Sequence, residues 1–335
     1  MAVLSTTNPT LLDLAKATDP DGNIADVVEI LTETNEILLD MTWMEGNLPT
    51  GHRTTIRAGL PTPTWRKLYG GVQPTKGTTV QVDDACGMLE AYAEIDKALA
   101  DLNDNAAAFR LMEERAHIEG MNQELVDTLF YGDESGEPEA FTGFAPRFNA
   151  TSADNGENII LGGGSGSGNA SIWLVVWGPN TCHGIVPKGS ISGLQRTDKG
   201  QVTIEDASGG SNTGRMEAYR THYRWDAGLC VRDWRYVVRI CNIDKSALTS
   251  DASGSSADLP DLIHQAITQI PSLNLGRPSL YMSRNTLGFL RRQVSSAVSQ
   301  STLTMDNVGG TLQTSFMGIP IRRCDALAAD EATIS

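Results

Sequence analysis

The sequence predicts an α+β protein with extensions attached to its core. Residues 104–131 carry one long helical pattern, whereas strand-like patterns gather later in the chain, at 171–177 and 219–240. The βαβ alternation of a doubly wound parallel sheet is absent. At 335 residues, the chain exceeds the ~250–300 residues at which a single core stops growing. We therefore expect either one large domain with attachments or two domains that share an interface.

Composition excludes several classes of protein. The formal net charge is −15, from 26 basic and 41 acidic residues, which argues against a surface that binds nucleic acid or anionic membrane throughout. A hydrophobic content of 40% and a charged content of 20% are typical of globular proteins. No apolar run approaches the ~20 residues of a membrane span, and no secretory signal is visible at the N-terminus.

The residue types that carry catalysis or bind metals are scattered. The five cysteines form no CxxC motif, and Cys182-His183 is the only adjacent Cys/His pair, so we expect reduced core thiols and no metal site. We expect each of the five histidines to be a surface or satisfied core residue. Asp83-Asp84 suits a turn better than a divalent ion. No phosphate-binding loop, G-x-S-x-G or H-E-x-x-H motif occurs. We therefore expect that the protein binds no cofactor and is not an enzyme. A hydrolase with a dispersed active site remains the alternative.

Residues 46–82 form a basic segment without any acidic residue. Its charge of +5 leaves −20 for the rest of the chain (−15 − 5 = −20). Residues 53–56 and 78–82 favour two strands of a long hairpin, whose tip is stiffened by prolines. The five cations of this segment are Arg53, Arg57, Arg66, Lys67 and Lys76.

The next stretch, residues 83–139, is acidic. Sixteen acidic and three basic residues give it a charge of −13 (3 − 16 = −13). It contains the long helical pattern, whose apolar stripe consists of Leu111, Ile118, Met121, Leu125 and Leu129. The acidic residues on this helix, among them Glu113, Glu114 and Glu119, form either a solvated face or a contact face.

The two segments of opposite charge suggest contact between copies. An ordered loop this long needs contacts that offset its conformational entropy. A neighbouring copy could supply them if the basic loop met the acidic helix, in a head-to-tail interface that closes into rings or shells. The alternative is that the loop pairs within its own chain.

The second half of the chain mixes strands and helices. Residues 171–177 predict a buried strand. The alternation at 219–225 and 234–240, with the turn signal Asp226-Ala-Gly228 between the two runs, predicts an antiparallel hairpin. The later elements are expected at 259–270 (helix), 279–282 (strand), 285–294 (helix) and 316–322 (strand). The hairpin is rich in arginine, which leaves a DNA-binding protein as a second alternative; its arginines are Arg220, Arg224, Arg232, Arg235 and Arg239.

Five groups of residues, in one order, resemble the major capsid proteins of tailed bacteriophages of the short-tailed type. The strongest group lies in residues 60–82, LPTPTWRKLYGGVQPTKGTTVQV, and includes Trp65 and Tyr69. The others are Leu129-Phe-Tyr-Gly-Asp133 with Phe141-Thr-Gly143; Trp177-Gly178 with Val186-Pro-Lys-Gly189 and Gly193-Leu194; Trp225, Gly228, Leu229, Asp233, Trp234 and Arg239; and Phe316, Gly318-Ile-Pro320 and Asp325.

The resemblance implies the Hong Kong 97-type capsid fold and a role as the subunit of an icosahedral shell around packaged double-stranded DNA, without catalysis. The implied parts are an N-terminal arm (1–45), an extended loop (46–85), a peripheral domain with a long spine helix (86–150), an axial domain with connecting strands (151–315) and a C-terminal strand and tail (316–335).

The implied partners are other copies in pentamers and hexamers, a portal, packaged DNA held without sequence-specific contacts, and a possible decoration or cementing protein. No long charged helix precedes the arm, so we expect a separate scaffolding protein. The implied location is the virion capsid, assembled in the cytoplasm of the bacterial host. The residues that we expect to contact neighbouring subunits are Arg53, Arg57, Trp65, Arg66, Lys67, Tyr69, Lys76, Glu113, Glu114 and Glu119.

Overall fold

The computed structural model describes residues 33, 35–103, 106–166, 168–205, 214–249, 257–296, 303–308, 311–327 and 330–335. Their contacts divide the chain into two compact units. The first contains the described parts of Met1–Thr34, Met88–Val126 and Gly193–Asp226, and the second contains the described parts of Asn35–Gly87, Asp127–Ser192 and Ala227–Ser335. This division differs from the expected segments, because residues 193–226 fold with residues 88–126 and not with the rest of 151–315.

The core of the second unit is a mixed sheet around β5 (Asn169–Trp177). Every residue of β5 is buried, as its continuous apolar sequence predicts for a central strand. It pairs antiparallel with β9 (Val237–Asp244) on one side and with β10 (Arg277–Met282) on the other. The sheet of this unit also contains β1 (Trp43–Glu45), β4 (Ile159–Leu161), β6 (Cys182–Val186), β11 (Leu303–Val308), β12 (Thr311–Phe316) and β13 (Ile319–Arg323).

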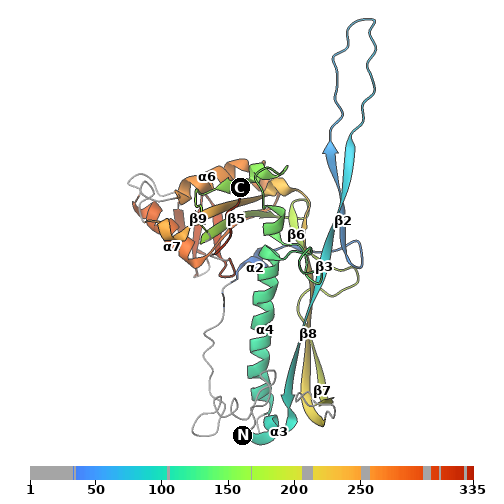
Figure 1. Cartoon of the computed structure of the whole chain (residues 1–335), viewed down its shortest axis with the longest axis vertical. Helices are drawn as coiled ribbons and strands as arrows, with labels where there is room; N and C mark the ends of the chain where they lie inside the picture. The colour runs from blue at the N-terminus through green and yellow to red at the C-terminus, as the bar shows by residue number, and fades with distance from the viewer. Residues whose placement is uncertain are drawn as a thin grey trace. The chain divides into compact units, whose positions relative to one another are not determined.

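Two amphipathic helices of the second unit, α6 (Leu259–Gln269) and α7 (Arg284–Ser296), pack against this sheet (Figure 1). The Asp258 carboxylate caps α6 by accepting a hydrogen bond from the Asp261 amide. The helix buries Leu262, Ile263 and Ala266, which lie on one face at helical spacing. The short helices of this unit are α2 (Ile37–Asp40) and α5 (Phe144–Arg147).

An aromatic cluster in the second unit explains one of the motifs of the sequence. Phe130, at the end of α4 (Ala106–Tyr131), lies 6.0 Å from Phe144 and 6.2 Å from Trp173 between ring centroids. The chain then turns back tightly, and the Gly143 amide donates to the Gly132 carbonyl. A Cβ at either glycine would lie within 2.6 Å of a backbone oxygen, so only glycine fits both positions.

The first unit combines the first part of α4 with long strands. These are β3 (Thr78–Asp96), which begins in the second unit, β7 (Gln195–Glu205) and β8 (Arg215–Val231); α3 (Lys97–Ala100) is a short helix. The long helix was expected at 104–131 and is confirmed. Its apolar stripe is only partly buried: Met121 and Leu125 are in the core, whereas Leu111 and Ile118 are exposed.

Two expectations about strands are wrong. The hairpin expected at 219–225 and 234–240 does not form, because β8 runs straight through the supposed turn at Asp226-Ala-Gly228. β8 pairs with β7 and β6, while β9 pairs with β4 and β5. The strand expected at 316–322 is instead the end of β12, a turn and β13, because Met317 and Gly318 both take positive φ values, 51° and 81°.

Some expectations fall outside the described residues. These are the expectations for the N-terminal arm before residue 33 and for the parts of the axial segment at 206–213 and 250–256. Among the helices that the structure describes, none is long and apolar enough to cross a membrane.

Candidate functional site

The hairpin of β2 (Gly51–Gly59) and β3 carries a long loop, residues 60–77, without secondary structure (Figure 1). The strands pair antiparallel from Gly51↔Ala85 to Gly59↔Thr78, with a bulge near the loop. Three prolines (Pro61, Pro63 and Pro74) lie in the loop, where they cost no ladder hydrogen bonds and restrict the backbone. The hairpin predicted from the sequence is therefore confirmed.

The loop exposes large apolar side chains. Leu60 is 78% exposed, Leu68 is 85% exposed, and Trp65 and Tyr69 are fully exposed. Tyr69 also takes a left-handed backbone conformation, with φ 64°, which a bulky residue adopts only at a cost. Such a group of apolar side chains on a soluble protein typically marks a surface that another molecule covers.

Of the five cations in the basic segment at residues 46–82, one forms an ion pair and four form none with the described residues. Arg53 lies opposite Asp83 in the β2–β3 register and forms an ion pair of 2.6 Å with it. For Arg53, the alternative that the segment pairs within its own chain therefore holds. Among the described residues, the exposed side chains of Arg57, Arg66, Lys67 and Lys76 form no ion pair.

Glu114, expected at a contact between subunits, lies instead inside the first unit. It is only 3% exposed, and its carboxylate accepts hydrogen bonds from Arg196 Nη2 at 2.7 Å and Thr221 Oγ1 at 2.7 Å. Burial acts to raise the pKa of Glu114, but the bonds from Thr221 and Arg196 outweigh it and hold the pKa below its usual value. Glu114 is therefore a core residue, and it is not accessible to a neighbouring subunit as we expected.

The other two glutamates that we expect to contact neighbouring subunits are accessible. Glu113 and Glu119 are both partly exposed on α4. The Glu119 carboxylate accepts hydrogen bonds from the Glu33 amide at 3.0 Å and from the Gln123 side chain at 2.9 Å. Neither residue is buried as Glu114 is, so both can face another molecule.

Most of the arginines behind the DNA-binding alternative are paired within their own unit. Arg220 pairs with Glu94 and Arg224 with Asp226 in the first unit, and Arg235 pairs with Asp233 in the second. The other two also lie in the second unit: Arg232 donates to the Pro179 carbonyl, and Arg239 is buried against Glu331. The sequence pattern suggested a basic face, but pairing within each unit neutralises most of it.

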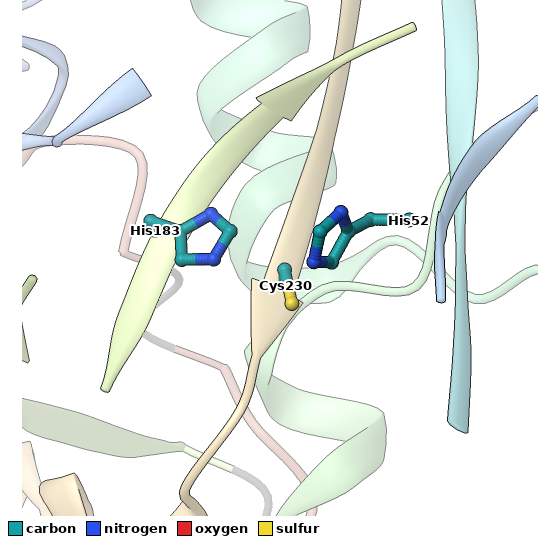
Figure 2. A group of neighbouring side chains, drawn as sticks. All are labelled: His52, His183 and Cys230. Atoms are coloured by element: carbon teal, nitrogen blue, oxygen red, sulfur yellow. The ribbon is translucent and has the colours of Figure 1, made fainter. Parts of the chain in front are cut away.

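The structure also gathers residues that sequence spacing did not connect. His52 of β2, His183 of β6 and Cys230 of β8 offer ligand atoms within 4.8 Å of one another (Figure 2). Burial, together with the nearby Asp84 carboxylate, raises the pKa of Cys230 to about 12. A thiol with this pKa is a poor nucleophile at neutral pH, so the group does not favour the hydrolase alternative.

Comparison with known proteins identifies the family. The family model of the major capsid protein GP7 matches residues 19–335. The chain is similar to a chain in the structure of bacteriophage Epsilon15, with 38% identity, a TM-score of 0.78 and coverage of 100% of this chain and 99% of the other. It is also similar to the bacteriophage JBD30 capsid, with 10% identity, a TM-score of 0.47 and coverage of 89% and 93%. No curated protein sequence matches.

The family match and the likeness to the Epsilon15 chain confirm the α+β Hong Kong 97-type capsid fold that the sequence resemblance implied. The protein thus belongs to the GP7 family of major capsid proteins, copies of which form the icosahedral shell of a bacteriophage virion.

Proposed function

We propose that residues 60–77 of one subunit bind a neighbouring subunit and hold the shell together around packaged double-stranded DNA. The observation that carries this proposal is the exposure of Trp65, Leu68 and Tyr69 beside cations that form no ion pair with the described residues. Aromatic and arginine side chains are the residues that contribute most to binding at protein interfaces. In the free subunit they contact solvent, and in the shell a second copy buries them.

The loop is suited to binding at low entropic cost. Its prolines restrict the backbone before any contact forms, so less conformational freedom is lost on binding. The β2–β3 ladder fixes both ends of the loop, and the Arg53–Asp83 pair lies across that ladder. Stiffness at the base and exposed side chains at the tip support a loop that reaches across to a neighbour.

The surface that we propose as its partner is the acidic part of α4 on the adjacent copy. Glu113 and Glu119 are accessible there, and Arg66 and Lys67 of the loop would meet them. Complementary charges steer association and fix the register of an interface. Because the loop and the helix are different surfaces, the contact is head-to-tail and generates closed rings when repeated.

The experiment replaces Arg66→Glu and Lys67→Glu together. We expect the variant subunit to keep the thermal unfolding midpoint of the wild type but to lose closed shells and rings in negative-stain electron microscopy. A matched control, Lys188→Glu with Lys199→Glu, changes the net charge equally at exposed lysines outside the loop and should assemble normally.

A charge swap tests the partner surface separately. Glu113→Lys with Glu119→Lys should impair assembly alone. Mixing these subunits with the Arg66→Glu, Lys67→Glu subunits should restore part of it, because both contacts between unlike subunits then join opposite charges, whereas contacts between like subunits do not. Normal shells from the loop variant alone would refute the role of the loop. Loss of shells without any rescue would refute only the choice of α4 as its partner.

The remaining parts of the proposal concern the virion as a whole. We propose a separate scaffolding protein, a portal, and a possible decoration protein as further partners, with assembly in the cytoplasm of the bacterial host. The shell holds DNA without sequence-specific contacts, for which a net charge of −15 is suitable because strong binding would hinder movement of the DNA. No catalytic role is proposed for this chain.

A further inference from the structure

The cluster of His52, His183 and Cys230 lies within the second unit, where three strands meet. His183 and Cys230 are neighbours in the β6–β8 register, and His52 comes from β2. The two imidazole rings lie 5.7 Å apart between centroids, with their planes at 79°. Figure 2 shows the rings approaching from two strands toward Cys230 on a third.

One atom of this cluster has an unsatisfied hydrogen-bonding capacity. His183 is fully buried, and its Nε2 has no hydrogen-bond partner among the described residues. Its Nδ1–H donates to the Gly184 carbonyl at 3.3 Å, so Nε2 carries a free lone pair. A buried polar atom without a partner is costly, and a ligand for that lone pair would remove the cost.

The hydrogen bond to Gly184 is also the arrangement that metal-binding histidines use. The second ring nitrogen of such a histidine usually donates to a carbonyl or carboxylate, which fixes the tautomer and orients the ring. His52 is only partly buried and leaves a route of entry for an ion.

We propose that His52, His183 and Cys230 bind a divalent transition-metal ion of the zinc class through two imidazole nitrogens and one thiolate, with water in the fourth position. Two nitrogens and one sulfur are donors that Zn²⁺ prefers in tetrahedral geometry. Bond lengths of about 2.0–2.3 Å place ligand atoms about 3.3–3.8 Å apart. The present separations of up to 4.8 Å therefore require closure by about 1 Å, which side-chain rotation can supply.

Binding involves a balanced exchange of protons. The Cys230 thiol releases one proton to solvent as its sulfur forms the bond to the metal, so the ion's charge of +2 becomes +1 for the metal–thiolate unit. The Asp84 carboxylate, which lies opposite His52 in the β2–β3 register and is paired with Arg147, adds negative charge nearby. To bind the metal through Nε2, His52 must carry its proton on Nδ1. Nδ1 can then no longer accept the 3.3 Å hydrogen bond from the exposed Asn47 amide and donates to water instead.

A bound ion would link the base of the extended loop to the sheet. β2 leads directly into residues 60–77, while His183 of β6 and Cys230, in the last part of β8, pair with each other in the second unit. A metal shared by all three strands would join segments that are far apart in sequence and stabilise the folded state by mass action. The site would thus stiffen the subunit where the loop begins.

The test uses the full-length chain, freed of metal and titrated with Co²⁺ as the spectroscopic probe. We expect about one Co²⁺ per chain, visible d–d bands of tetrahedral intensity and a near-ultraviolet charge-transfer band from the cobalt–thiolate bond. Zn²⁺ should displace the cobalt, abolish these bands and raise the thermal unfolding midpoint.

Variants identify the ligands. Cys230→Ser should abolish the charge-transfer band, and His52→Gln should weaken Co²⁺ binding at least about tenfold, while Cys241→Ser and His264→Gln, which lie outside the cluster in the same unit, should bind as the wild type does. Circular dichroism checks that each variant is folded. If Cys230→Ser does not fold, His52→Gln still decides the question, because that ring is only partly buried.

Absence of a charge-transfer band in the wild type would overturn the proposal. So would a band that survives in Cys230→Ser or binding that is unchanged in His52→Gln, since the cobalt would then occupy an adventitious surface site.

Discussion

The loop at residues 60–77 and the sheet around β5 differ in whether their side chains are buried within one subunit. Every residue of β5 is buried within the subunit, whereas the loop leaves Trp65 and Tyr69 fully exposed. The sheet is complete in one copy of the chain. The loop is not, and from this difference we expect the stability of the subunit and the stability of the shell to depend on separate sets of residues.

The charges of the two regions show the same difference. Arg239 of β9 is buried, donates to Glu331 at 2.7 Å and to the Phe148 carbonyl at 2.8 Å, and lies over the Trp173 ring. Ser171 also hydrogen-bonds Glu331. The loop cations have no such partners among the described residues. Substitutions in the two regions should therefore separate folding from assembly.

The largest expected effect is on the sheet. Arg239→Ala leaves the Glu331 carboxylate buried without its partner and should reduce the free energy of unfolding by about 3–5 kcal/mol. Urea denaturation of the unassembled subunit measures this. Arg235→Ala, nearby in the chain but with an exposed side chain paired with Asp233, is the matched control and should cost less than about 1 kcal/mol. Equal losses in both variants would contradict the comparison.

The second effect is on assembly alone. Trp65→Ala and Tyr69→Ala should each weaken the contact between subunits by about 2 kcal/mol or more, the range of residues that dominate an interface. The critical concentration for assembly, measured by light scattering, should rise at least about tenfold, because 1.4 kcal/mol corresponds to a factor of ten. Trp65→Phe and Tyr69→Phe should retain most of the contact. A lowered unfolding midpoint in the alanine variants would show instead that the loop packs within its own subunit.

The third effect is a pH dependence in the first unit. The pKa of Glu114 is held below its ordinary value of 4.5, so the folded state favours the carboxylate. Its contribution is complete above the ordinary pKa and is lost as pH falls through the lower folded pKa. Glu114→Gln should reduce the free energy of unfolding by about 1–3 kcal/mol at neutral pH and flatten its decline in acid. Thermal unfolding of both proteins from neutral to acidic pH tests this, and parallel curves would refute it.

The smallest effect is expected at the base of the loop. Arg53 and Asp83 form a short ion pair, but their side chains are 49% and 55% exposed. Exposed pairs gain little because water and salt screen them. Asp83→Asn should leave the unfolding midpoint unchanged within error, at low and at high salt. A large, salt-dependent drop would mean that this pair belongs with the buried network.

Local sequence determined several elements of this protein. The apolar run at β5, the helical spacing of α4 and the two strands beside the proline-rich loop each satisfy conditions within a short segment, and all three form where they were expected. The charge of the basic loop was also visible, because it depends only on composition. Even the resemblance to phage capsid proteins rested on short motifs such as the glycines at 132 and 143.

Tertiary structure decided what depends on distant partners. Asp226-Ala-Gly228 has the composition of a turn, yet it continues β8 because β6 and β7 offer hydrogen-bonding partners on either part of the strand. The sequence suggested that Glu114 is a surface acid, but in the fold Arg196 and Thr221 hydrogen-bond to it and it is buried. His52, His183 and Cys230 are separated by long stretches of chain, so no spacing in the sequence relates them. Periodicity and composition fix which segments can form strands or helices, but pairing between remote strands fixes which side chains meet.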